Sequence, residues 1–156
     1  MIVGLGTGST VFFLVKKLAE LVKQGLDITC VSTSNQTSEL AKSLGIRISS
    51  LNEVEKIDLT IDGADEVDKN LNGIKGGGGA LLYEKIVAKA SNKVIWIIDS
   101  SKYVLQLGKF PLPVEIISFG SNQLLKKFDE LGFNPEIRKN GNDNFITDSG
   151  NLIVDL

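Results

Sequence analysis

The sequence predicts an α/β fold: a mainly parallel, Rossmann-like sheet with helices on both faces, followed by a small α+β lobe. Two observations lead to this prediction. Apolar runs typical of strands alternate with segments of helical spacing through Ile98. From Lys109 the pattern changes, because Pro111 and Pro113 interrupt it and a β-α-β-β order follows. We therefore expect an α/β catalytic domain over residues 1–108 and the lobe over residues 109–156.

The strands predicted for the first domain are short apolar runs: Ile2–Val3, Ile28–Val31, Ile46–Ile48, Ile57–Ile61 and Val94–Ile98. Helical length and spacing are found over Thr10–Lys23, Gln36–Leu44 and Ala80–Ser91. In open sheets of this kind the ligand lies at the carboxyl ends of the strands. The segments that directly follow the strands are therefore the place to seek a site.

The lobe is predicted to contain a strand, a helix, a second strand, a turn and a hairpin: Val114–Ile117, Asn122–Leu131, Pro135–Lys139, Asn140–Asp143 and Asp148–Gly150. This order corresponds to part of a ferredoxin-like unit. Because the sequence stops just after an apolar run, we expect the lobe to be incomplete at its C-terminus.

Composition argues against several classes of function. A net charge of −2 gives no general attraction to nucleic acid or to an anionic membrane. The apolar run Val11–Val15 is too short to span a bilayer and follows no basic segment, so we expect a cytoplasmic protein. Cys30 is the only cysteine, which excludes an intramolecular disulfide. The sequence has no histidine, so Ser-His-Asp catalysis and imidazole metal sites are excluded.

The first predicted strand leads into GLGTGST, Gly4–Thr10, and then into a helix. Glycines allow close approach of an anion, the helix offers free N–H groups, and Thr7, Ser9 and Thr10 add hydroxyl groups. A dinucleotide site would need a carboxylate after the second strand, where the sequence has Val31–Ser34, and a Walker A loop would need a lysine after the glycines. A phosphate group is therefore favoured, although a tight turn that packs strand on helix would use the same glycines.

The fourth predicted strand opens into DGADE, Asp62–Glu66, which brings several carboxylates to the end of an apolar strand. A single aspartate there would most simply cap a turn or helix, but the cluster favours a function. Asp68, Asn70 and Asn72 match the beginning of a calcium loop. The twelfth position of that loop is Gly79 rather than glutamate, so calcium is disfavoured.

Lys75 and four glycines, Gly76–Gly79, precede the helix that carries Glu84. The glycine N–H groups and the lysine would stabilise a negative oxygen, whereas a flexible linker is the alternative explanation. Glu84 alone could be an ordinary solvated helix residue, but it shares a helical face with small, weakly polar residues. Lys102 follows the last strand of the domain and could simply extend into solvent, yet beside an anion loop it is a candidate phosphate ligand.

Taken in order, these motifs resemble the ribose-5-phosphate isomerases of type A over essentially the whole chain. The resemblance rests on GLGTGST, TSNQTSELAKSLGI, DGADEVD, KGGGGAL with Glu84, DSSK, GKFPLPVE, LGFNPEIR and TDSGNLIVD. Members of that family usually carry a helix before the first of these strands and further chain beyond the hairpin.

The resemblance implies interconversion of D-ribose 5-phosphate and D-ribulose 5-phosphate in the pentose phosphate pathway, without a metal or organic cofactor, by a homo-oligomer. It implies that Glu84 accepts the proton, and we assign Asp62, Asp65 and Lys75 supporting catalytic roles. The substrate-binding positions that it implies are Thr7, Gly8, Ser9, Thr10, Asp62, Gly63, Ala64, Asp65, Lys75, Gly76, Gly77, Gly78 and Lys102. A non-catalytic sugar-phosphate sensor on the same scaffold is the alternative, and a coenzyme A transferase or sugar-phosphate deaminase is a third possibility.

Overall fold

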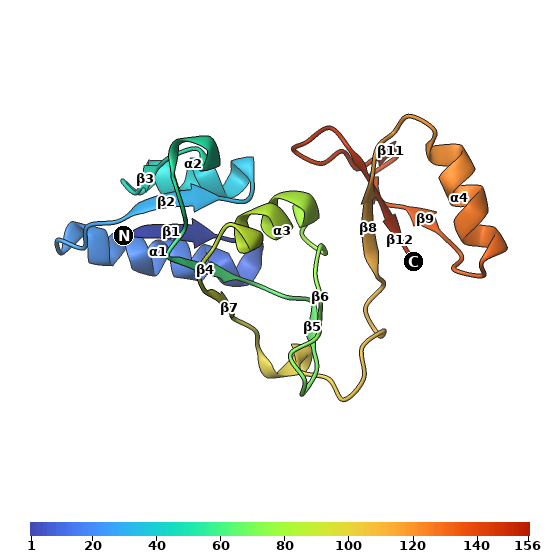
Figure 1. Ribbon diagram of the computed structural model, residues 1–156, viewed down its shortest axis with the longest axis horizontal. Coiled ribbons are helices and arrows are strands. Elements are labelled where there is room, and N and C mark those ends of the chain that lie inside the picture. The colour runs from blue at the N-terminus through green and yellow to red at the C-terminus, as the bar shows by residue number, and fades with distance from the viewer.

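The computed structural model describes residues 1–156 and places two units side by side, with a small hairpin projecting beneath them (Figure 1). The first unit is built on five parallel strands in the spatial order β3-β2-β1-β4-β7. Their bounds in that order are Arg47–Ile48, Thr29–Ser32, Ile2–Leu5, Leu59–Asp62 and Val94–Trp96. The predicted α/β fold with a parallel sheet is confirmed.

Helices cover both faces of this sheet. On one face, α1 (Ser9–Lys23) and α2 (Asn35–Ser43) pack against alternate residues of the central strands. On the other face, α3 (Leu81–Lys89) contributes Val87 to a smaller apolar cluster with Val31 and Ile57. Val31 and its neighbour Cys30 belong to opposite clusters, as the alternation of side chains along a strand requires.

The second unit is a three-stranded antiparallel sheet in the order β8-β12-β9 with one helix. Its apolar cluster is centred on Ile116, Leu152 and Val154. The elements are β8, α4, β9 and β12, with bounds Pro113–Ile116, Ser121–Glu130, Glu136–Ile137 and Leu152–Asp155. Because each unit has its own sheet and cluster, we infer a division close to the predicted position, Gly108.

The predicted elements differ from the structure mainly at their ends. The fourth strand begins at Leu59 rather than Ile57, which forms only an isolated bridge with Ser91. The predicted strand Pro135–Lys139 is divided, because its last residue pairs in a separate hairpin of β10 (Lys139–Asn140) and β11 (Asp143–Asn144).

Four short elements were not predicted. β5 (Glu66–Val67) and β6 (Gly73–Ile74) form the hairpin seen below the main sheet in Figure 1. Two single-turn 3₁₀ helices, η1 (Leu51–Glu53) and η2 (Ser100–Lys102), follow β3 and β7. No helix is both long and apolar enough to cross a membrane.

Candidate active site

A polar pocket of about 180 Å³ lies at the carboxyl ends of β1 and β4. Segments far apart in the sequence meet there because all strands of the parallel sheet end at this edge. The lining residues are Thr7, Gly8, Ser9, Thr10, Gly63, Ala64, Asp65, Lys75, Gly76, Gly78, Glu84 and Lys102. All twelve are among the positions singled out from the sequence, whereas two predicted residues, Asp62 and Gly77, do not line this pocket.

Glu84 lies in the first turn of α3 and is almost fully buried, with 3% of its surface exposed. Its Oε2 atom lies 2.9 Å from the Nζ atom of Lys75 and has no hydrogen-bond partner within the chain besides this ion pair. Burial, followed by the nearby charge of Asp62, raises the pKa of Glu84 to about 7, although the ion pair with Lys75 acts in the opposite direction. A carboxylate with this pKa can both take and return a proton near neutral pH.

Lys75 contacts the carboxylates of Asp62 and Glu84 and the loop that follows β4. Its Nζ atom lies 2.9 Å from Oδ2 of Asp62 and donates to the carbonyl oxygen of Gly63 at 2.6 Å. Burial alone would lower the pKa of Lys75, but the charges of Asp62 and Glu84 outweigh it and raise that pKa. The ammonium group is therefore held in its charged form next to Glu84.

Asp62 lies behind the pocket, 1% exposed, and organises the residues that form it. One carboxylate oxygen accepts from the N–H groups of Thr7 at 3.2 Å and Gly63 at 2.7 Å, while the other pairs with Lys75. The close approach of Asp62 to the first loop requires glycine at position 6, where a Cβ atom would lie 1.8 Å from Oδ1 of Asp62. The structure therefore supports a positioning role for Asp62.

The GTGST segment, Gly6–Thr10, forms another wall and continues into the first turn of α1, which begins at Ser9. Gly8 has a φ of 107°, a conformation that favours glycine, and no side chain caps the helix. The hydroxyl groups of Ser9 and Thr10 make no hydrogen bond within the chain, which leaves them free for a ligand. The hydroxyl group of Thr7 instead bonds to those of Thr33 and Ser34, so it supports the loop from inside.

Lys102 ends η2 and reaches the pocket from the side of β7. The neighbouring Asp99 is used elsewhere: its Oδ1 atom accepts from the backbone and hydroxyl groups of Ser101, and it forms no ion pair with Lys102. The lysine therefore faces a wall of free N–H and hydroxyl groups across a small cavity. This combination is typical of a phosphate site.

The glycine loop between Lys75 and α3 is held by groups on both sides. The N–H of Gly77 donates to Oδ2 of Asp65 at 2.8 Å. From the small unit, Arg138 donates to the carbonyl oxygens of Gly76 and Gly77. No group of three or more His, Cys, Asp and Glu side chains is arranged to hold a metal ion.

Comparison with known proteins identifies the family. The sequence profile of the family described as ribose 5-phosphate isomerase A (phosphoriboisomerase A) matches residues 29–156. The ribose-5-phosphate isomerase A of Bifidobacterium adolescentis is 58% identical over all of this chain and 68% of the relative, and that of Limosilactobacillus reuteri is 55% identical with 70% of the relative covered. The chain belongs to the ribose 5-phosphate isomerase A family.

Solved structures of ribose 5-phosphate isomerases agree with this assignment. A D-ribose-5-phosphate isomerase in complex with phospho-erythronic acid superimposes with a TM-score of 0.94 at 42% identity, covering 99% of this chain and 70% of that chain. The Plasmodium falciparum enzyme gives a TM-score of 0.93 at 43% identity, covering 99% and 69%. The fold of the ribose 5-phosphate isomerase family therefore extends over both units.

Three charged residues near the isomerase-family site were assigned no role from the sequence, although Glu66 was counted in the carboxylate cluster Asp62–Glu66. Glu66 is buried in the hairpin and accepts from the N–H groups of Gly108 and Phe110, fixing the segment that joins the two units. Glu115 and Arg138 extend from the small unit to α3 and to the glycine loop. In the sequence, Glu66, Glu115 and Arg138 are distinguished only by lying inside the motifs DGADEVD, GKFPLPVE and LGFNPEIR. Membership in a motif does not indicate which residues their side chains contact.

Proposed function

We propose that this chain interconverts D-ribose 5-phosphate and D-ribulose 5-phosphate, with Glu84 carrying the proton between C2 and C1. The observation that carries the proposal is the placement of Glu84: buried, beside Lys75, with a pKa of about 7, in a pocket whose other walls suit a phosphate. Family membership and the named activity of the relatives support the same reaction.

In the proposed mechanism the phosphate is bound by the N–H and hydroxyl groups of the GTGST loop and by Lys102. This places the open-chain aldehyde end of the sugar toward Glu84. The ionised carboxylate removes the proton from C2, and the electrons move to the aldehyde oxygen, giving an enediolate. Glu84 then returns the proton to C1, and the proton of the O2 hydroxyl is transferred to the oxyanion on O1 as the C2 carbonyl of the ketose forms, so the reaction is balanced without an oxidant.

Lys75 and the glycine loop are proposed to stabilise the enediolate oxygen. The Lys75 ammonium group lies 2.9 Å from Glu84, so a substrate oxygen beside the carboxylate is also within reach of the positive charge. Asp65 lines the pocket and is proposed to bind a sugar hydroxyl. Asp62 holds Lys75 in its charged form and in place.

The test is direct observation of turnover by the 156-residue chain. Formation of ribulose 5-phosphate from ribose 5-phosphate is followed with and without EDTA, and binding of phospho-erythronic acid is measured in parallel by calorimetry. The proposal expects turnover that is unchanged by EDTA. Binding without turnover would identify the chain as a sugar-phosphate sensor instead, and loss of turnover in EDTA would contradict the predicted metal-independent mechanism.

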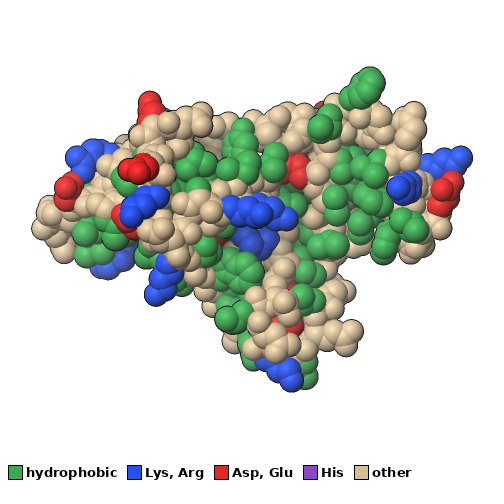
Figure 2. Space-filling model, in the orientation of Figure 1, with side chains coloured by type: hydrophobic (Ala, Val, Ile, Leu, Met, Phe, Trp, Pro, Cys, Tyr) green, Lys and Arg blue, Asp and Glu red, His purple; other side chains and the backbone are tan.

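We further propose that the chain acts as a homo-oligomer, a dimer or tetramer, in the cytoplasm. Apolar side chains reach the surface around α3, where Leu82, Tyr83 and Ile86 are 37%, 38% and 43% exposed (Figure 2). Their burial between subunits would be favourable. Sedimentation velocity at micromolar concentration should show a species of at least twice the chain mass, and a monomer at all concentrations would contradict the proposal.

A further inference from the structure

Arg138 links the small unit to the glycine loop of the pocket. It follows β9, and its Nε atom donates to Oδ2 of Asp155 at 2.9 Å while Nη2 bonds the second oxygen of that carboxylate. The remaining nitrogen, Nη1, donates to the carbonyl oxygens of Gly76 at 2.8 Å and Gly77 at 3.1 Å. One guanidinium group therefore bridges the last strand of the small sheet and two consecutive glycines.

These contacts fix the direction of an N–H group in the pocket. In a planar trans peptide, the carbonyl oxygen and the following N–H point in opposite directions. Because Arg138 holds the carbonyl of Gly77, the N–H of Gly78 is directed away from Arg138. Gly78 lines the pocket, and its N–H forms no hydrogen bond within the chain. It is therefore available to an oxygen atom of a bound ligand.

Glycine runs do not hold such a direction by themselves. Without Cβ atoms, four consecutive glycines have access to many backbone conformations, and Gly76 and Gly79 adopt positive φ values of 103° and 78°. The loop is fixed by outside contacts: Arg138 on its carbonyl side and Asp65 on the N–H of Gly77. A lysine at position 138 would lose the bidentate contact with Asp155, because its donors converge on one nitrogen and it lacks the planar fork that also reaches the two carbonyls.

A second contact from the small unit holds the helix that follows the loop. Oε2 of Glu115, on β8, accepts from the N–H of Leu82 at 3.0 Å, two residues before Glu84. Its other oxygen accepts from the side chains of Thr147, Ser149 and Asn151. A carboxylate at the start of a helix is favourable, since the first N–H groups there lack partners. The segment from Lys75 to Glu84 is thus held at both ends by the small unit.

We propose that Arg138 is a positioning residue for the isomerisation: by holding the Gly76 and Gly77 carbonyls, it directs the Gly78 N–H toward the oxygen that becomes negative in the enediolate. This inference rests on the proposed function, because it concerns the same pocket and reaction. It assigns to the small unit an effect on the chemical step that acts through the glycine loop. Arg138 itself touches neither the substrate nor the reacting atoms.

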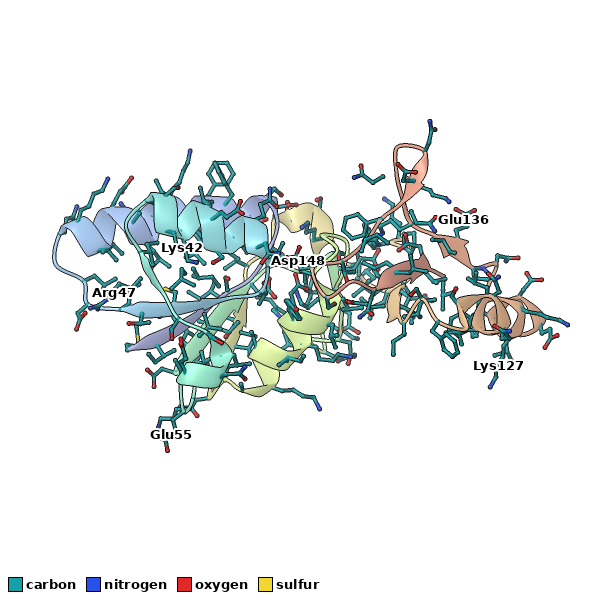
Figure 3. All side chains as sticks on the ribbon, turned by 90° about the horizontal axis from the view of Figure 1, so that it is seen from above. Lys42, Arg47, Glu55, Lys127, Glu136 and Asp148 are labelled. Carbon is teal, nitrogen blue, oxygen red and sulfur yellow. The ribbon has the colours of Figure 1, made fainter.

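The test compares Arg138→Lys with Arg47→Lys in the 156-residue chain. Arg47 is the only other arginine and pairs with Asp27 at the end of the sheet farthest from the small unit (Figure 3). For each variant, calorimetric titration with phospho-erythronic acid gives the number of competent sites, and steady-state kinetics with ribose 5-phosphate gives kcat per site and KM. We expect Arg138→Lys to lower kcat per site by about tenfold or more with KM changed by less than about threefold. Arg47→Lys should change neither.

A role for Arg138 in folding alone would lower the number of competent sites and leave kcat per site unchanged, which would overturn the proposal. An effect confined to KM would also overturn it. If Arg138→Lys does not fold, Asp155→Asn tests the same idea, because it removes the carboxylate that holds the guanidinium group and keeps the arginine. Asp155→Asn should also lower kcat per site. An unchanged kcat per site in this variant would refute the proposal. Absence of turnover in the unmodified chain would instead refute the proposed function, and this inference with it.

Discussion

The Nζ atom of Lys75 lies 2.9 Å from Oδ2 of Asp62 and 2.9 Å from Oε2 of Glu84, so one ammonium group is shared by two buried carboxylates. The two carboxylates are inequivalent. Oδ1 of Asp62 accepts from two backbone N–H groups, whereas no hydrogen bond within the chain holds the carboxylate of Glu84 besides the ion pair with Lys75. The shared cation therefore keeps Asp62 as a fixed support and leaves Glu84 as the group that can exchange a proton.

The acid limb of the pH profile should report Glu84. Its pKa of about 7 lies well above the ordinary value because burial and the charge of Asp62 disfavour the ionised form. Since the proton is removed by the ionised form, kcat/KM should fall as the pH decreases through about 7, approaching about a tenfold loss per pH unit. Steady-state rates from about pH 5 to pH 9 measure this. A flat profile between about pH 6 and pH 8 would contradict the assignment.

The same pKa predicts that Glu84 costs stability at neutral and higher pH. The pKa of Glu84 is raised from 4.5 to about 7 in the folded chain, so folding favours the protonated carboxyl group. The resulting contribution to the free energy of unfolding is fully present below about pH 4.5 and is lost as the pH rises through 7. Glu84→Gln removes this loss, and Lys75 retains Asp62 as its partner. The variant should have a higher Tm than the unmodified chain at pH 8, by a larger margin than at pH 5. Calorimetry at the two pH values checks this, and a lower Tm for the variant at pH 8 would contradict it.

Lys102 should contribute to binding of the phosphate group of the substrate and not to binding of its sugar. Lys102 lines the pocket and forms no ion pair with a carboxylate. Lys102→Ala should weaken binding of ribose 5-phosphate by about tenfold or more, the effect of losing a charge-assisted hydrogen bond, with little effect on free ribose. Lys127→Ala, in α4 at the far end of the small unit, is the matched control (Figure 3). Equal losses for both ligands would argue against a phosphate role.

Gly6 should be intolerant of any side chain. An added Cβ would lie 1.8 Å from Oδ1 and 2.7 Å from Cα of Asp62, so both the carboxylate and the strand β4 would have to move. We expect Gly6→Ala to lower the free energy of unfolding by about 3 kcal/mol, in the range of other overpacked sites. At Gly63 the nearest atom to an added Cβ is 3.8 Å away, so Gly63→Ala should be close to neutral. Denaturant unfolding of both variants tests this, and similar stabilities would show that β1 and β4 can separate.

Most of the fold and of the pocket could be predicted from the sequence because the signals are local. Hydrophobic alternation with glycine stops indicated β1, α1 and the other regular elements, and the rule for parallel sheets indicated where the motifs would meet. The short hairpin of β5 and β6 was missed, since two-residue strands carry no periodicity. Asp68, which resembled part of a calcium loop, instead accepts from the N–H groups of Asn70 and Asn72 in the turn of that hairpin.

The parts of the site that could not be predicted depend on long-range contacts. Nothing in the sequence around Arg138 indicates that its side chain crosses to Gly76 and Gly77, 62 and 61 residues earlier. The same holds for Glu115 and the first turn of α3, and for Asp148, which accepts from the N–H of Asn35 and lies at the junction of the two units (Figure 3). Side-chain direction at these positions is set by how the two sheets are placed against each other.

The central claim is that Glu84 carries the proton, and Glu84→Gln tests it most directly, because the amide keeps the shape and removes the base. The measurement is kcat for ribose 5-phosphate together with the dissociation constant of phospho-erythronic acid, beside the exposed control Glu130→Gln. The account predicts a loss in kcat of about a thousandfold, binding within about threefold of the unmodified chain, and a control that behaves normally. Turnover by Glu84→Gln at the rate of the unmodified chain would contradict it.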